Sequence, residues 1–254
     1  MRILPVLFAS LMTSLVLTGA FAEAKADPIR NVVLVHGAFA DGSGWQGVYQ
    51  RLVDKGFKVS VVQEPETSLE DDVEATRRVI DIQDGPVVLV GHSYGGEIIT
   101  EAGTDPKVKA LVYVAAYVPE VGESAASLQG RIPAASTAIG DAGSGSLIID
   151  TARYHADFCA DLPEEQANFM AHSQVLTSKS ALNAPAKAAA WHDIPSYGIV
   201  SGHDRTINPD LERWMYKRAG VKTTEIAGSS HVAMISHPKE VAAVIERAAN
   251  EAGK

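Results

Sequence analysis

Residues 87–96, with the sequence VVLVGHSYGG, combine a short apolar run with the pattern Gly91-His92-Ser93-Tyr94-Gly95. This Gly-x-Ser-x-Gly pattern is typical of a sharp turn between a strand and a helix, which holds the serine in strained backbone geometry. The two glycines leave room that a side chain would fill. We therefore predict that Ser93 is a nucleophile at the end of a strand. The alternative is a glycine-rich turn without a catalytic role.

Further short apolar runs alternate with amphipathic stretches along the chain. The predicted strands, rich in β-branched residues, are 31–36, 58–62, 86–90, 110–115, 197–201 and, more weakly, 222–226. The predicted helices are 45–55, 69–83, 93–103, 210–218 and 238–251. Buried strands that alternate with helices indicate an α/β domain with a mostly parallel β-sheet flanked by helices.

The segment 118–193 interrupts this alternation. It contains no predicted strand, and its residues 140–146 (GDAGSGS) suit a flexible turn. Helices are predicted at 150–160 and 163–173, so we interpret the segment as a helical cap insertion over a site. Four of its aromatic side chains are candidates for lining the pocket, although the core is the favoured place for each: Tyr154, Phe158, Phe169 and Trp191.

The composition is typical of a globular protein, with 46% hydrophobic and 21% charged residues among 254. Asp and Glu (31) outnumber Lys and Arg (22), giving a formal net charge of −9, so nucleic acid is not an expected partner. Cys159, the single cysteine, cannot form an internal disulfide and suits a small buried residue. Neither a metal-ligand pattern nor a dinucleotide-binding glycine pattern is present, so no metal and no cofactor are expected. The sequence makes no prediction about the oligomeric state.

The N-terminal 22 residues have the pattern of a signal peptide. Arg2 precedes the apolar stretch 3–17, and Ala20-Phe21-Ala22 fits the small-x-small cleavage rule. The stretch is short for a membrane span, which needs ~20 residues, so no stable membrane anchor is expected. A buried first helix or a retained anchor is the alternative. We expect one exported domain over residues 23–254, in a bacterial periplasm or secreted.

A serine hydroxyl needs a base, usually a histidine steered by a carboxylate. On this kind of elbow the acid and then the histidine follow the serine in the chain. His231 lies in the loop between the last predicted strand and the last helix, and Asp204 follows the strand before it. We therefore predict that Ser93, Asp204 and His231 are the catalytic residues, with Glu120 as the alternative acid.

The negative charge that develops on the substrate oxygen needs two backbone N–H donors. One is expected from Tyr94, directly after the nucleophile. The other is expected from Ala38, in the loop after the first predicted strand, where Gly37 permits close approach.

These motifs together resemble the α/β-hydrolase superfamily over about residues 30–250. The shared segments are VLVHGA at 33–38 with Trp45, VGHSYGG at 90–96, Asp204, and IAGSSHVAM at 226–234. They are most similar to the small Ser-Asp-His esterases of the plant methylesterase and hydroxynitrile lyase group, and to related bacterial α/β hydrolases. This resemblance implies the same triad and the same oxyanion donors.

The expected function is that of an exported serine esterase, which cleaves a small-molecule carboxylic ester through an acyl-enzyme on Ser93. A lactonase, amidase or C–C hydrolase, or a cofactor-free perhydrolase, would use the same residues. A non-catalytic ligand-binding protein would be expected to lack part of the triad. Hydroxynitrile lyases have Thr and Lys at the positions of Gly37 and Val232, so no cyanide release is expected here.

Overall fold

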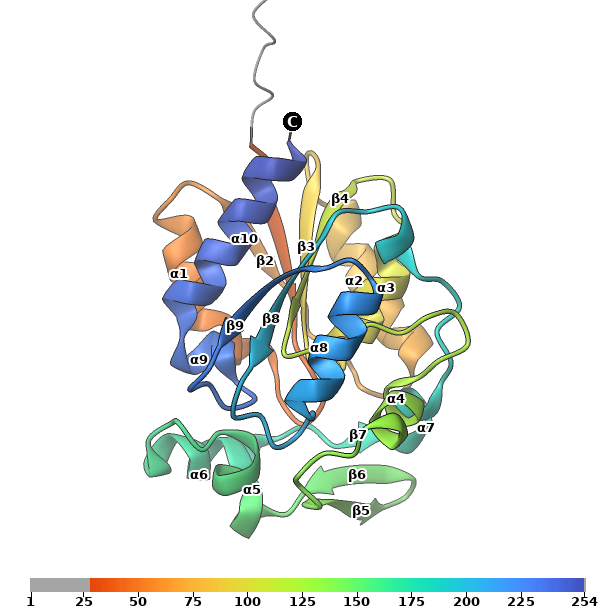
Figure 1. Cartoon of the computed structure of the whole chain (residues 1–254), viewed down its shortest axis with the longest axis vertical. Coiled ribbons are helices and arrows are strands. Elements are labelled where there is room, and N and C mark those ends of the chain that lie inside the picture. Colours follow the sequence, from red (N-terminus) through yellow and green to blue (C-terminus); the bar gives the residue numbers. More distant parts are fainter. Residues whose placement is uncertain (1–27, 254) are drawn as a thin grey trace, which may run out of the picture.

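A computed structural model of the chain describes residues 28–253. Its centre is a six-stranded sheet in the order β2-β1-β3-β4-β8-β9, in which all neighbouring strands run parallel (Figure 1). The strands are β1 (Asn31–Val35), β2 (Lys58–Val61), β3 (Val87–His92), β4 (Val108–Val114), β8 (Ser196–Ser201) and β9 (Lys222–Ile226). The predicted α/β class with a mostly parallel sheet is confirmed, and all six predicted strands are present close to their predicted bounds.

The central strands are apolar because both of their faces are covered. Every residue of β1, β3 and β8 is buried, whereas the edge strands β2 and β9 are mostly half-buried or exposed. This exposure explains why residues 222–226 have a weak apolar signal. Cys159 is also fully buried, and burial raises the pKa of its thiol to about 12, as expected for a core residue.

Helices cover both faces of the sheet. On one face α10 packs against α1 and contacts β4 and β8, while α2, α3 and α8 cover the other face (Figure 1). These helices are α1 (Gln46–Val53), α2 (Leu69–Asp81), α3 (Gly95–Ala102), α8 (Pro209–Arg218) and α10 (Pro238–Ala252). The short α9 (Ala233–Ser236) precedes α10.

The cap lies between β4 and β8 in the chain and sits at the carboxyl ends of the core strands (Figure 1). It comprises α4 (Ala125–Arg131), β5 (Ile139–Gly143), β6 (Ser146–Ile149), α5 (Thr151–Phe158), α6 (Glu164–Ser173), β7 (Thr177–Ser178) and α7 (Lys179–Asn183). The expectation of a purely helical cap is wrong, because β5, β6 and β7 form an antiparallel sheet. Gly143, Ser144 and Gly145 all have positive φ, so the turn-rich patch is the tip of a hairpin. Because β5 is exposed at every residue, it lacks the apolar run that marks the core strands.

Within residues 28–253, no helix is long and apolar enough to cross a lipid bilayer. The predicted signal peptide, residues 1–22, lies outside the described part of the chain.

Candidate active site

Ser93 lies in the turn between β3 and α3, and its backbone has a φ of 53°. This conformation is unfavourable for residues other than glycine, so the turn is strained. A Cβ atom at Gly91 would lie 2.4 Å from the carbonyl oxygen of Gly95, and one at Gly95 would lie 2.4 Å from that of His36. These contacts explain the two glycines of the motif.

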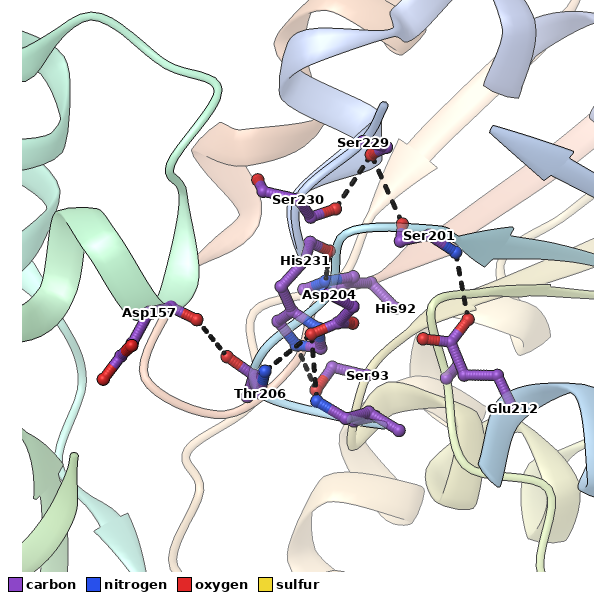
Figure 2. A network of polar contacts seen from close by, with 12 residues as sticks. His92, Ser93, Asp157, Ser201, Asp204, Thr206, Glu212, Ser229, Ser230 and His231 are labelled. Atoms are coloured by element: carbon purple, nitrogen blue, oxygen red, sulfur yellow. Dashed lines mark hydrogen bonds and ion pairs between the residues drawn. The ribbon is translucent and has the colours of Figure 1, made fainter. Parts of the chain in front are cut away.

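The side chains of Ser93, His231 and Asp204 form a continuous hydrogen-bonded chain (Figure 2). Ser93 Oγ lies 2.8 Å from His231 Nε2, and His231 Nδ1 lies 2.5 Å from Asp204 Oδ2. The three residues follow the carboxyl ends of β3, β8 and β9, which meet at one edge of the parallel sheet. The structure therefore brings together the three residues that the sequence singles out. All three are buried, with His231 fully so.

The carboxylate of Asp204 is oriented by the backbone of its own loop. Its Oδ1 accepts hydrogen bonds from the N–H groups of Thr206, at 2.7 Å, and Ile207, at 2.9 Å. These two donors leave Oδ2 directed at His231. The arrangement can therefore hold the imidazole with Nε2 toward the serine.

Two other carboxyl groups of this region have different surroundings. Glu120, the alternative acid, lies 2.9 Å from Nε2 of His192 and is 38% exposed, so it takes no part in the chain. Glu212 is fully buried, and its Oε2 accepts the N–H of Ser201 at 3.1 Å. Burial, reinforced by the charge of Asp204, raises the pKa of Glu212 well above its ordinary value.

Two aromatic rings hold His231 in place, and sequence reasoning assigned neither of them this position. His92 Nε2–H donates to the carbonyl oxygen of His231 at 2.9 Å, and the two rings lie 4.7 Å apart. Burial lowers the pKa of His92 well below its ordinary value. Phe158 of the cap meets the His231 ring edge-on at 5.0 Å. The position of His92 next to Ser93 in the Gly-x-Ser-x-Gly motif is the sequence feature that could have indicated this contact.

A cavity of about 230 Å³ opens beside Ser93, and both predicted oxyanion donors, Ala38 and Tyr94, line it. At Gly37 a Cβ atom would lie 2.6 Å from Ser93 Cβ, so only glycine allows the backbone this close to the nucleophile. The rest of the wall is largely apolar: Phe39, Tyr117, Ala125, Ala126, Gln129, Ile139, Leu147, Leu182, Asn183 and Thr206.

None of the four aromatic cap residues lines the cavity beside Ser93. Tyr154 and Phe158 are fully buried, Trp191 is 9% exposed, and Phe169 is 73% exposed. Tyr154 and Phe169 line a separate groove of about 430 Å³ that does not include Ser93. The interpretation as core residues is confirmed for Tyr154, Phe158 and Trp191, whereas Phe169 belongs neither to the core nor to the cavity beside Ser93. The cap side of the cavity comes instead from α4, α7 and the β5–β6 hairpin, elements that the sequence did not predict.

The described residues contain no group of three or more His, Cys, Asp or Glu side chains arranged to hold a metal ion. The site combines a serine with a base, an oriented carboxylate and N–H groups at one cavity.

Comparison with known proteins shows the family to which the chain belongs. Residues 32–244 match the model of the alpha/beta hydrolase family. The chain is 30% identical over 247 residues to the alpha/beta hydrolase nvfD of Aspergillus novofumigatus, which covers 87% of this chain and 97% of that protein. It is 26% identical over 251 residues to the putative methylesterase 19 of Arabidopsis thaliana, covering 85% and 96%.

Among solved structures, the extracellular alpha/beta-hydrolase from a Paenibacillus species superposes with a TM-score of 0.74 at 18% identity, covering 87% of this chain and 99% of that one. At this identity the likeness shows a common fold. The chain belongs to the alpha/beta hydrolase family. Within that family it is a hydrolase of the esterase type.

Proposed function

We propose that the protein is an exported serine esterase that hydrolyses small, uncharged carboxylic esters through an acyl-enzyme on Ser93. The observation that carries the proposal is the buried chain from Ser93 Oγ through His231 to Asp204, which ends at a small apolar cavity.

In this mechanism Ser93 Oγ attacks the ester carbonyl carbon while His231 Nε2 takes the hydroxyl proton. The carbonyl oxygen becomes an oxyanion, which the N–H groups of Ala38 and Tyr94 stabilise. His231 then protonates the leaving alcohol, and the C–O bond breaks to give the acyl-enzyme. Water attacks the acyl group with the same histidine as base and releases the acid. Asp204 fixes the imidazole tautomer and stabilises the imidazolium.

The cavity wall indicates the substrate class. Its residues include no Lys, Arg, Asp or Glu, and its polar groups are neutral amides and hydroxyls. An anionic acyl group would lose its hydration without gaining a charged partner, which is costly. At about 230 Å³ the cavity lies below the usual range for drug-sized ligands, so a short acyl chain is favoured.

Cyanohydrin cleavage is the alternative reaction that the same triad can support, and two residues argue against it. Val232 is fully buried beside His231 and offers no charge for a departing cyanide. Gly37 has no hydroxyl to bind the cyanohydrin oxygen, and the contact with Ser93 leaves no space for one.

The test is a series of p-nitrophenyl esters with acyl chains of increasing length, and mandelonitrile as the lyase substrate. We expect turnover of the shorter esters to exceed that of the long ones, with cyanide release at the buffer rate. No ester turnover, or cyanide release above the buffer rate, would contradict the proposal.

Export is the second part of the proposal and rests on the signal-peptide pattern of residues 1–22. The extracellular Paenibacillus hydrolase with the same fold supports it by analogy. In a bacterial host we expect the protein in the periplasm or medium, with a mature N-terminus near Glu23. Retention of an intact N-terminus in the cytoplasm would contradict export.

A further inference from the structure

The loop His36–Phe39, here called the oxyanion loop, ends at a strained residue. Phe39 has a φ of 63°, which a bulky side chain rarely adopts. Such a conformation persists only where its surroundings hold it. Phe39 directly follows Ala38, whose N–H is the proposed oxyanion donor. The contacts that hold the backbone of Phe39 therefore also fix the peptide unit between Ala38 and Phe39.

The backbone of Phe39 is held on both sides, in large part by the cap. Its N–H lies 3.2 Å from Oγ1 of Thr177 in β7 and 3.4 Å from Oε2 of Glu66. Its carbonyl oxygen accepts the hydroxyl of Tyr154 in α5 at 3.3 Å. Thr177 in turn donates its hydroxyl to Glu66. Thr177 and Tyr154 are more than a hundred residues away in the chain, so these contacts exist only when the cap is seated.

Glu66 also links this loop to the second proposed donor. It is 1% exposed, and its own N–H donates to Asp72 Oδ1 at 2.8 Å. Asp72 Oδ2 accepts the hydroxyl of Tyr94 at 2.8 Å. Phe39, which directly follows Ala38, and Tyr94 are therefore linked to one pair of buried carboxyl groups, those of Glu66 and Asp72.

His36 holds the other peptide unit that flanks Ala38. Its Nδ1 donates to the carbonyl oxygen of Gly37 at 3.0 Å, and its Nε2 lies 2.5 Å from Oε2 of Glu64. The Gly37 carbonyl belongs to the same planar peptide as the Ala38 N–H, so fixing one directs the other. Burial alone would lower the pKa of His36, but the hydrogen bond to Glu64 and its charge raise the pKa to about 9.

Three carboxyl groups and one imidazole buried together are costly to desolvate, and such clusters are weak contributors to stability. Their contacts converge instead on the peptides around Ala38 and on Tyr94. We infer that Glu66, together with Thr177 of the cap, is a positioning residue that sets the oxyanion loop, so that the seated cap completes the oxyanion hole. This inference rests on the proposed function.

The first test compares three variants of the full chain on a short p-nitrophenyl ester. Thr177→Val keeps the shape and removes the hydroxyl, Glu66→Leu removes the acceptor, and Glu66→Gln restores an acceptor without charge. Because loss of one oxyanion donor costs about 10²–10³ in kcat, weakening its support should lower kcat about 10- to 100-fold in Glu66→Leu and about 10-fold in Thr177→Val. KM should stay within about twofold, and Glu66→Gln should regain most of the loss.

The second measurement separates positioning from general damage. A trifluoromethyl ketone, which forms a tetrahedral adduct with the serine, should lose affinity by the same factor as kcat/KM, because both report on the oxyanion. Matched controls are Thr76→Val, a buried threonine of α2, and Glu101→Gln, whose buried carboxylate accepts the N–H of Lys187 in the cap at 2.7 Å. Both controls should keep kcat within about twofold of the wild type.

The third measurement does not depend on turnover. Hydrogen exchange of the peptide that contains the Phe39 amide should be faster in Thr177→Val and Glu66→Leu and unchanged in Thr76→Val. Unchanged kcat and unchanged exchange in both variants, or an equal loss of kcat in Glu101→Gln, would overturn the inference. If the wild type cleaves no ester but exchange is still faster in Thr177→Val and Glu66→Leu, the proposed function is wrong. The role of Glu66 and Thr177 in holding the oxyanion loop is then still supported.

Discussion

The two halves of the reaction centre are built in different ways. The proton relay consists of three side chains at the ends of β3, β8 and β9, in direct contact at 2.8 and 2.5 Å. The oxyanion side consists of backbone N–H groups, and its loop is held by buried carboxyl groups and by two cap residues. All three side chains of the relay therefore come from the core, with Phe158 of the cap packed against His231, whereas the oxyanion loop is hydrogen-bonded to the cap directly. Variants of the two halves should differ in the size of their effects.

The largest effect is expected at the nucleophile. Ser93→Ala removes the attacking oxygen and little volume, so kcat for ester hydrolysis should fall by about 10⁴–10⁶ with an unchanged melting temperature. Steady-state kinetics and a thermal melt on the same preparation check this. Activity above about a tenth of the wild-type rate would place the nucleophile elsewhere.

The acid of the relay comes next. Asp204→Asn keeps the contacts with the loop N–H groups but favours the wrong tautomer of His231, so kcat should fall by about 10⁴. Glu120→Gln is the matched control, because this carboxylate pairs with His192 at the surface, and it should change kcat less than twofold. The opposite ranking of the two variants would move the acid to the loop after β4.

On the oxyanion side, Gly37→Ala should have a smaller effect. Its Cβ would meet Ser93 Cβ at 2.6 Å, so the loop must move away from the nucleophile. We expect a fall in kcat of about 10²–10³, the cost of losing one oxyanion donor. Gly44→Ala, where the nearest atom to a new Cβ lies at 3.5 Å, is the control. Wild-type activity in Gly37→Ala would show that the loop can move without cost.

The buried groups of the oxyanion side also predict a pH dependence of stability. The pKa of His36 is raised to about 9 by Glu64 against the effect of burial, and burial raises the pKa of Glu66 to about 8. Above pH 6.5 the folded protein therefore retains protons that the unfolded chain releases. The free energy of unfolding should fall as the pH rises from 6.5 through 9, because the slope follows the difference in bound protons.

The fall can reach about 5 kcal/mol, because the pKa values of His36 (about 9) and Glu66 (about 8) both lie above pH 6.5 and each pH unit of separation corresponds to about 1.4 kcal/mol. Urea unfolding at several pH values measures it. Because the pKa of His92 is lowered, this residue affects stability only below pH 6.5 and does not contribute to the change between pH 6.5 and 9. Glu66→Gln should flatten the fall, and stability that rises between pH 6.5 and 9 would contradict the protonation states assigned to this cluster.

The two halves also differ in how far the sequence predicts them. The strand ends, the elbow glycines and the loops that carry Asp204 and His231 follow from apolar runs and motif spacing, because a parallel sheet brings consecutive strand ends together. The segment around Glu64 and Glu66 has the composition of an exposed turn. In the folded chain this segment is buried against His36 and Phe39 and, at Glu66, against Thr177 of the cap.

The structure of the cap is also poorly predicted from the sequence. The hairpin strand β5 is exposed throughout and β6 is mostly half-buried, so residues 140–146 suit a flexible turn as well as a hairpin tip. The four aromatic candidates of the cap lie in the core, along a separate groove or at the surface. Cavity walls made by α4, α7 and the β5–β6 hairpin depend on how these pieces pack, which no local pattern encodes.

The central claim is that Ser93 becomes covalently acylated with His231 as its base. The most direct measurement is the intact mass of the protein after incubation with a fluorophosphonate, followed by mapping of the modified peptide. The account predicts one adduct per chain on the peptide that contains Ser93, none in Ser93→Ala, and much slower labelling in His231→Ala. An adduct on another residue, or esterase activity that persists without labelling, would contradict it.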